Sequence, residues 1–259
     1  MSMITFYYII SLLLGISLGS FLNALVWRTR ENIKIGKDRS MCPHCRRRLT
    51  WYENIPILSF IFLRGRARKC GKRISRQYPI VELVMGVLFL FVFYFHARGE
   101  LVFTPEIVRD WFIVFNLSFI FLYDFKYQEI LDFSTIPSII ILVLFSPAIG
   151  WHSWQSIGLA MLIGGGFFLA QYILSRGKWI GGGDIRLGFL MGVILGWPNI
   201  VLGLFLAYII GAVISLIMVS VKRQDFKGET PFGTYLVLGT FVAMFWGERI
   251  VGWYLSLLN

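Results

Sequence analysis

The sequence carries few charged residues, and this scarcity excludes a soluble globular protein. Only 15% of its 259 residues are charged, whereas 57% are apolar. Soluble domains have about 25% charged residues. The composition therefore predicts an all-α protein that crosses a membrane several times.

Cysteine is scarce too, and three cysteines are too few for a disulfide framework on the reducing cytoplasmic side of a membrane. The first apolar run is not preceded by a basic segment and is not followed by a small-residue cleavage pattern. We therefore expect this run to remain as a membrane helix and not to be removed as a signal peptide.

Long apolar runs predict eight membrane-spanning helices, at residues 4–27, 79–95, 105–123, 136–149, 157–174, 185–197, 200–221 and 232–246. A helix rises 1.5 Å per residue, so about 20 residues cross the hydrocarbon. The run 185–197 is shorter, and water is expected to enter near its cytoplasmic end. The predicted organisation is an anchoring helix (1–27), a basic insert (28–77) and a seven-helix body (78–259).

Basic residues predict the orientation of these helices. With the N-terminus outside, 22 of the 25 lysines and arginines fall in segments that face the cytoplasm. The positive-inside rule then places residues 28–77 in the cytoplasm and both termini outside.

The insert between residues 28 and 77 contains 15 basic and 3 acidic residues, a net charge of +12. This charge predicts attraction to anionic lipid headgroups. Nucleic acid is not the expected partner, because the sequence has no signature of a nucleic-acid-binding module. The apolar stretch Ile55–Leu63 is too short to cross, so it either packs in a small core or lies on the headgroups, where Trp51 and Tyr52 also fit.

Acidic residues at the cytoplasmic edge of the body are the candidates for catalysis, because a charge near hydrocarbon is costly unless it is paired or hydrated. They are Glu82, Asp124, Asp132 and Asp184. Asp124 ends one predicted span and Asp184 begins another, so both should lie at the same depth. Three glycines, Gly181–Gly183, precede Asp184 and permit close packing and positive φ, although they could also form a simple turn.

The segment Gly181–Leu187 resembles the Gly-x-Gly-Asp-x-(Lys/Arg)-Leu motif of type IV prepilin peptidases, which are intramembrane aspartic proteases. Further matches follow in the order of that family across nearly the whole chain. They are Gly19–Asn23, Cys42–Cys45, Trp51–Pro56, Arg64–Arg66, Ile74–Ser75, Tyr78–Pro79, Glu82, Asp124, Asp132 and Pro231–Gly233.

The resemblance implies an enzyme of the bacterial cytoplasmic membrane that cuts prepilin or pseudopilin precursors after a glycine that ends a short leader. Asp124 and Asp184 match the two catalytic aspartates of the family. Many members also methylate the new N-terminus from S-adenosylmethionine, and Glu82 would lie near that methyl-transfer site. An ion pair between Glu82 and an arginine of the insert is the structural alternative. Asp132 is expected to cap the next helix or to support the catalytic acids.

Cys42, Cys45 and Cys70 suggest a zinc site, since two thiolates three positions apart can bind one tetrahedral ion. The family pattern has a second Cys-x-x-Cys pair, whose first member would fall at position 67, but this residue is Ala67. The fourth ligand would then be His44, an acid or water. Bound zinc and three free thiols are both possible on this pattern. The presence of Ala67 in place of the family's cysteine bears on methylation more than on proteolysis.

A small membrane transporter is the alternative from another class, because paired intramembrane acids occur there too. Transporters usually line a path across the whole bilayer, whereas the acids of this chain cluster at one face. A methyltransferase without protease activity is a second alternative, in which the paired aspartates would have no catalytic task. Release of a leader peptide from a precursor would separate these classes.

Overall fold

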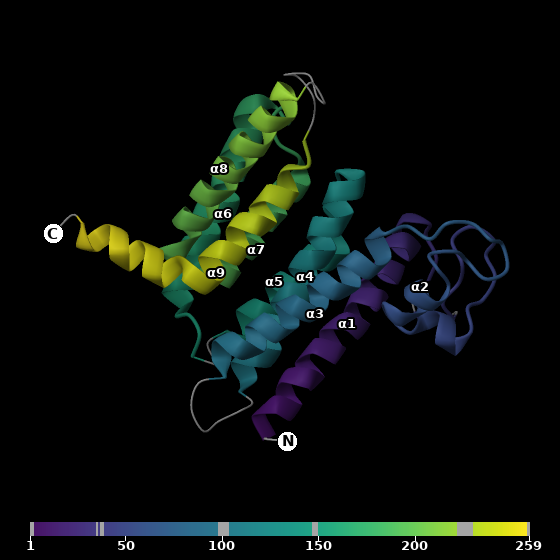
Figure 1. Ribbon diagram of the computed structural model, residues 1–259. Coiled ribbons are helices and arrows are strands. Elements are labelled where there is room, and N and C mark those ends of the chain that lie inside the picture. Colours follow the sequence, from purple (N-terminus) through teal and green to yellow (C-terminus); the bar gives the residue numbers. More distant parts are fainter. Residues whose placement is uncertain are drawn as a thin grey trace. The chain divides into compact units, whose positions relative to one another are not determined.

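The computed structural model describes residues 3–34, 36, 39–97, 104–146, 150–221 and 230–257. Within these residues the protein consists of nine α-helices and one short 3₁₀ helix, with isolated bridges in place of β-strands (Figure 1). This confirms the all-α fold class. The chain is a multi-pass membrane protein.

Five of the described helices are long and apolar enough to cross a membrane. They are α1 (Met3–Arg30), α3 (Gln77–His96), α6 (Trp154–Ser175), α8 (Asn199–Ser220) and α9 (Phe232–Ser256). The other three predicted spans are also helical, as α4 (Pro105–Tyr127), α5 (Asp132–Phe145) and α7 (Gly182–Leu195).

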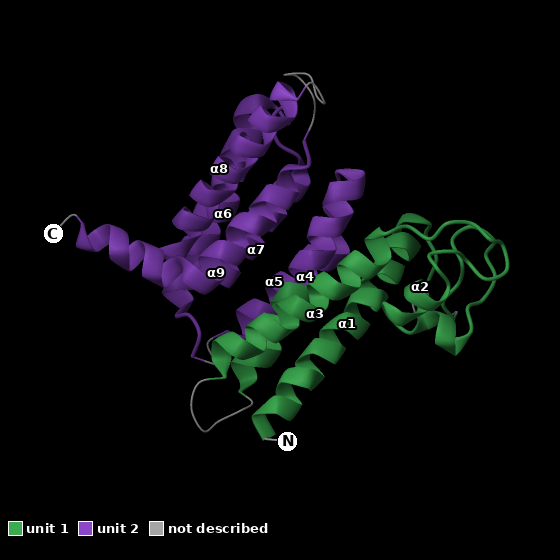
Figure 2. Cartoon of the chain, in the orientation of Figure 1, with its two compact units in different colours: residues 1–115 green, residues 116–259 purple. Residues whose placement is uncertain are grey.

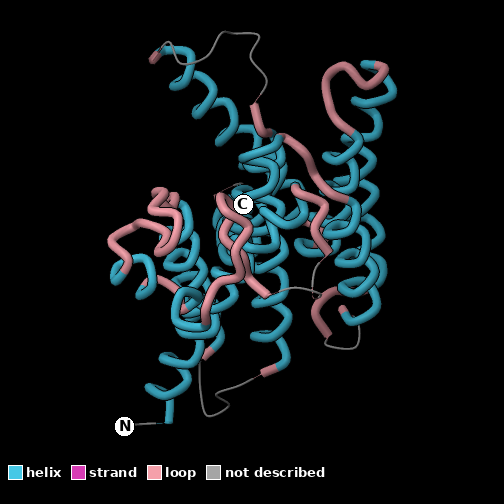
Figure 3. Tube along the Cα trace, turned by 90° about the vertical axis from the view of Figure 1, so that its right-hand side faces the viewer, coloured by secondary structure: helices cyan, strands magenta, loops and turns pink. Residues whose placement is uncertain are grey.

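The chain divides into two compact units, residues 1–115 and 116–259, and the boundary falls inside α4 (Figure 2). The first unit holds α1, the basic insert and α3. The insert contains η1 (Trp51–Asn54) and α2 (Leu58–Phe62), which are joined by loops. The second unit holds the last part of α4 and all later helices. Figure 3 shows the described helices and loops of the chain from another side.

In the first unit α1 packs closely against α3 because glycines line the contact. A Cβ on Gly19 would lie 2.7 Å from the Cα of Glu82. Small residues of this kind let two membrane helices approach backbone to backbone. The side-chain amide of Asn23 adds a bond to the Tyr78 carbonyl at 3.2 Å. This packing holds Glu82, at the start of α3, against α1.

In the second unit α7 is surrounded by α5, α6, α8 and α9. A Cβ on Gly188 would lie 2.6 Å from the Gly164 carbonyl oxygen of α6, so only small residues fit there. Eight of the 14 residues of α7 are buried, which explains how a helix this short can lie inside a membrane protein. Asp184 lies in the first turn of this helix, and the packing of α7 therefore fixes its position.

Candidate active site

The carboxylates of Asp124 and Asp184 come together in the second unit, as the resemblance implies. Asp124 lies in the last turn of α4 and is 4% exposed, while Asp184 lies in the first turn of α7. Both line one cavity of about 830 Å³, and the two carboxylates interact electrostatically. The loop after α4, the loop before α7 and the start of α9 supply the rest of its wall.

The N-terminus of α9 orients the Asp124 carboxylate. The backbone N–H of Thr234 donates a hydrogen bond of 2.8 Å to Asp124 Oδ2. Free N–H groups and the helix dipole favour a carboxylate at this end of a helix. A Cβ on Gly233 would lie 2.9 Å from the same oxygen, so the carboxylate fits only beside a glycine. Sequence reasoning noted the Pro231–Gly233 match but not this contact with Asp124.

The glycine run before Asp184 begins α7. Gly181 caps the helix, and its backbone N–H donates a bond of 3.1 Å to Asp184 Oδ2. None of Gly181, Gly182 and Gly183 adopts the positive φ that a glycine run permits. The reason is that the run forms the first turn of a helix. Close packing is confirmed at Gly183, where a Cβ would lie 2.8 Å from Ile130 Cβ.

Asp132 lies at the exposed rim of the cavity. The helix cap of α5 is Leu131, so the expectation that Asp132 caps this helix is wrong. Its carboxylate instead accepts a bond of 2.7 Å from Arg186 of α7. Arg186 is the basic residue of the Gly-x-Gly-Asp motif, and its partner could not be read from sequence because 54 positions separate them.

Glu82 lies in the first unit, buried at 6% exposure. Its carboxylate accepts a bond of 2.7 Å from the backbone N–H of Ile57 and a further bond from Ser20 of α1. The structural alternative, an ion pair with an arginine of the insert, is replaced by these two hydrogen bonds. Ile57 has a φ of 61°, which a β-branched residue adopts only when its surroundings enforce it. Glu82 therefore fastens the insert to the start of α3.

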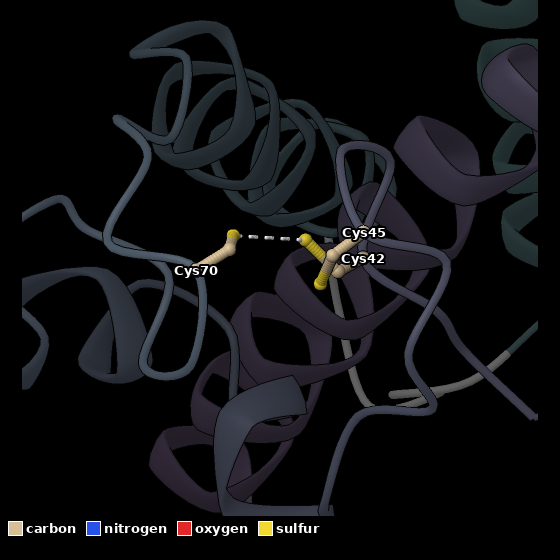
Figure 4. Close-up of side chains that lie close together, drawn as sticks. All are labelled: Cys42, Cys45 and Cys70. Carbon is tan, nitrogen blue, oxygen red and sulfur yellow. Dashed lines mark hydrogen bonds between the residues drawn. The ribbon is translucent and has the colours of Figure 1, made fainter.

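The three cysteines of the insert lie together (Figure 4). Their sulfur atoms are within 4.8 Å of one another, and Cys42 Sγ is 3.9 Å from Cys70 Sγ. The backbone N–H of Arg47 lowers the pKa of the Cys45 thiol, which favours the thiolate that a metal binds. Donor type and spacing thus fit three of the four ligands of a structural zinc site.

The backbone around these cysteines forms two loops of the same design. The N–H of Cys42 bonds to the Arg47 carbonyl at 2.8 Å, and the N–H of Ala67 bonds to the Lys72 carbonyl at 2.9 Å. A bridge closes each loop, between residues 41 and 48 in one and between 66 and 73 in the other. Position 67 of the second loop therefore corresponds to Cys42 of the first.

Comparisons with known proteins identify the family of this chain. Residues 13–96 match the model of the bacterial peptidase A24 N-terminal domain, and residues 111–216 match the type IV leader peptidase family. These models define a class of membrane peptidases. The chain is 30% identical to a prepilin leader peptidase/N-methyltransferase of Bacillus subtilis (strain 168), over 94% of this chain and 96% of the relative.

A protein of the same name from Legionella pneumophila is 28% identical over 97% of this chain and 95% of its own length. No solved structure matches the chain at a significant level. The chain belongs to the type IV prepilin leader peptidase/N-methyltransferase family, peptidase A24.

Proposed function

We propose that this protein is an aspartic endopeptidase that removes the leader peptide of type IV prepilins or pseudopilins, after a glycine, at the cytoplasmic face of the membrane. The observation that carries the proposal is the pair of carboxylates, Asp124 and Asp184, in one cavity at two helix ends. The substrate class follows from the names of the relatives.

The chemistry is that of two carboxyl groups that share a proton. Two close carboxyls do not both ionise at neutral pH, so one remains protonated and the pair titrates as a unit. The ionised member accepts a proton from the attacking water, and the protonated member donates a bond to the scissile carbonyl. The N–H groups of Thr234 and Gly181 hold the two carboxylates in place for this exchange.

Substitution of the two aspartates tests the proposal. Asp124→Asn and Asp184→Asn should each abolish leader release from a purified prepilin in detergent, because an amide can neither accept the proton nor share one. Asp132→Asn is the matched control, and it should retain most activity because the exposed pair with Arg186 contributes only about 0 to 1 kcal/mol. A large residual rate in a folded, membrane-inserted Asp124→Asn or Asp184→Asn variant would remove that residue from the catalytic pair.

We further propose that the insert, residues 28–77, serves the second activity in the relatives' name, methylation of the new N-terminus from S-adenosylmethionine. Glu82 would act there by fastening the insert, and zinc bound to Cys42, Cys45 and Cys70 would hold its two loops together. Mass spectrometry of the processed N-terminus reports cleavage and methylation separately.

The same proposal places the insert on the cytoplasmic headgroups, attracted by anionic lipid. Among the described residues from 33 to 76 only Cys42 and Glu53 are buried, so the insert has no apolar core of its own. Trp51, Ile61 and Phe62 are 77%, 60% and 81% exposed. Apolar side chains beside many cations are typical of a surface that lies in the membrane interface. This supports the headgroup alternative for residues 55–63.

A further inference from the structure

A polar pair lies between two of the most apolar helices of the second unit. The side-chain amide of Gln171 in α6 is 3.2 Å from the Tyr208 hydroxyl in α8, and the hydroxyl is 3.4 Å from the amide oxygen. Tyr208 is 38% exposed. Both helices are long enough to cross the membrane, where polar side chains are costly and usually have a function.

The pair borders the candidate active site. The ring of Tyr208 meets Phe232 edge to face at 5.2 Å, and Phe232 lines the cavity that holds both aspartates. The phenol also interacts electrostatically with Asp184. A second aromatic contact, with Phe167 at 5.9 Å, continues the wall outward, and Phe167 is 44% exposed. The pair thus lies beside the cavity on a surface open to the surroundings of the helices.

A peptide that reaches this cavity from the bilayer must unwind locally before it can be cleaved. In hydrocarbon its backbone groups must be hydrogen-bonded, so its apolar segment is helical. A carbonyl within a helix is bonded to the N–H four residues later and shielded from attack. Cleavage therefore requires a local unwound stretch, and the N–H and C=O groups released there need new partners within the protein.

We propose that Gln171 and Tyr208 supply these partners, binding the unwound backbone on the apolar side of the scissile bond. An amide and a phenol can each donate and accept, so together they can replace bonds of either kind. They act as positioning residues, because the aspartates perform the chemistry. The inference rests on the proposed peptidase function. The competing reading is a structural bond that only joins α6 to α8.

Two variants and two precursors separate these readings. Tyr208→Phe retains the ring and removes the hydroxyl, and Gln171→Met retains the length of the side chain. One precursor has its native apolar segment, and the other is a peptide that ends shortly after the cleavage site, so it has no backbone on the apolar side for the pair to bind. Tyr254→Phe, near the far end of α9, is the control for loss of an exposed hydroxyl.

We expect either variant to raise KM for the native precursor, and to lower kcat/KM by about fivefold, the effect of one hydrogen bond. The effect should disappear with the shortened precursor, and the control variant should cleave both precursors at the normal rate. An equal loss with both precursors, or no loss with either, would overturn the inference. Failure of the unaltered protein to cleave the native precursor would overturn the proposed function, and this inference with it.

Discussion

Gly182 and Gly183, which precede Asp184, have different surroundings and therefore different roles. A Cβ on Gly183 would lie 2.8 Å from Ile130 Cβ, closer than carbon atoms approach without a shift, whereas a Cβ on Gly182 would meet nothing within 4 Å. The motif alone could not distinguish them. Only Gly183 is required by packing, because it lets α7 begin against the loop that follows α4.

Gly183→Ala should therefore displace the first turn of α7 and with it Asp184. A displacement of about 1 Å can lower a rate on the order of a hundredfold. Gly182→Ala is the matched control, and it should cleave near the normal rate because alanine favours a helix at this position. Steady-state cleavage of a prepilin measures both. Equal activity of the two variants would show that the Ile130 contact does not position Asp184.

The ion pair between Glu53 and Arg47 predicts that the stability of the insert depends on pH. Arg47 donates two bonds to its carboxylate, at 2.7 and 3.1 Å, and thereby lowers the pKa of Glu53 from 4.5 to about 2. A carboxyl whose pKa is lower in the folded state stabilises the fold above its unfolded pKa. The stabilisation is present above about pH 4.5 and is lost as the pH falls toward 2.

Hydrogen exchange of residues 47–54, corrected for the intrinsic exchange rate at each pH, measures this effect. At pH 6 Glu53→Gln should exchange faster than the unaltered protein, by about tenfold for a loss near 1.4 kcal/mol. The difference should shrink as the pH falls, because protonated Glu53 also loses its charge. A difference that is constant from pH 6 to 3 would contradict the role assigned to the Arg47 pair.

At the scale of elements, the two cysteine loops make a prediction about the metal site. Because position 67 corresponds to Cys42, Ala67→Cys should supply the fourth thiolate of a tetrahedral site. Zinc should then bind about tenfold tighter or more, which requires only ~1.4 kcal/mol. Competition with a chelator measures the affinity, and the visible spectrum of the cobalt-substituted protein reports the number of thiolates.

Ala67→Ser is the control for this substitution, since it has nearly the same size and adds no thiolate. Its zinc affinity should remain that of the unaltered protein. Equal affinities of Ala67→Cys and Ala67→Ser would mean that position 67 does not point toward the three sulfur atoms. In that case the two loops would share a backbone design without forming one site.

Elements were easier to predict than their contacts. Each of the eight apolar runs contains a helix within its described residues, because each run determines its own helix; residues 147–149, at the end of the run 136–149, lie outside the described residues. The partner of Glu82 was not predicted, because Ile57 offers only a backbone N–H, which any residue has. The partner of Asp132 was not predicted either, because α5 and α7 meet only in the folded unit. Helices can be predicted from local sequence patterns, whereas contacts between residues that are distant in sequence form only in the folded chain.

For the whole molecule, the main prediction is the number of membrane crossings. The cavity that Asp124 and Asp184 share limits which numbers are possible. If only the five long apolar helices crossed, Asp124, between α3 and α6, would lie outside, and Asp184, just after α6, would lie inside. Both carboxylates line one cavity, which argues against this arrangement. We therefore expect a further pair of helices between α3 and α6 to cross, and α4 and α5 occupy that part of the chain.

We expect α7 to cross as well, because of its contacts with α6. Gly188 meets Gly164, and further along the backbone N–H of Trp197 bonds to Ser156 Oγ at 2.9 Å. The chain thus returns along α6 to the level where that helix begins. With α8 and α9 following, we expect eight crossings, which would bring the C-terminal end to the side opposite the insert. Five crossings would leave it on the same side as the insert.

Reporter fusions after Arg76 and after Asn259 test this count. A reporter that is active only in the cytoplasm should give a signal after Arg76 and none after Asn259, and a reporter active only outside should show the reverse. The distribution of basic residues, 22 inside and 3 outside, favours the same orientation. A cytoplasmic signal after Asn259 would require an odd number of crossings. Because the cavity requires Asp124 and Asp184 on one face, the error would then lie in α7, α8 or α9, after the catalytic pair is already in place.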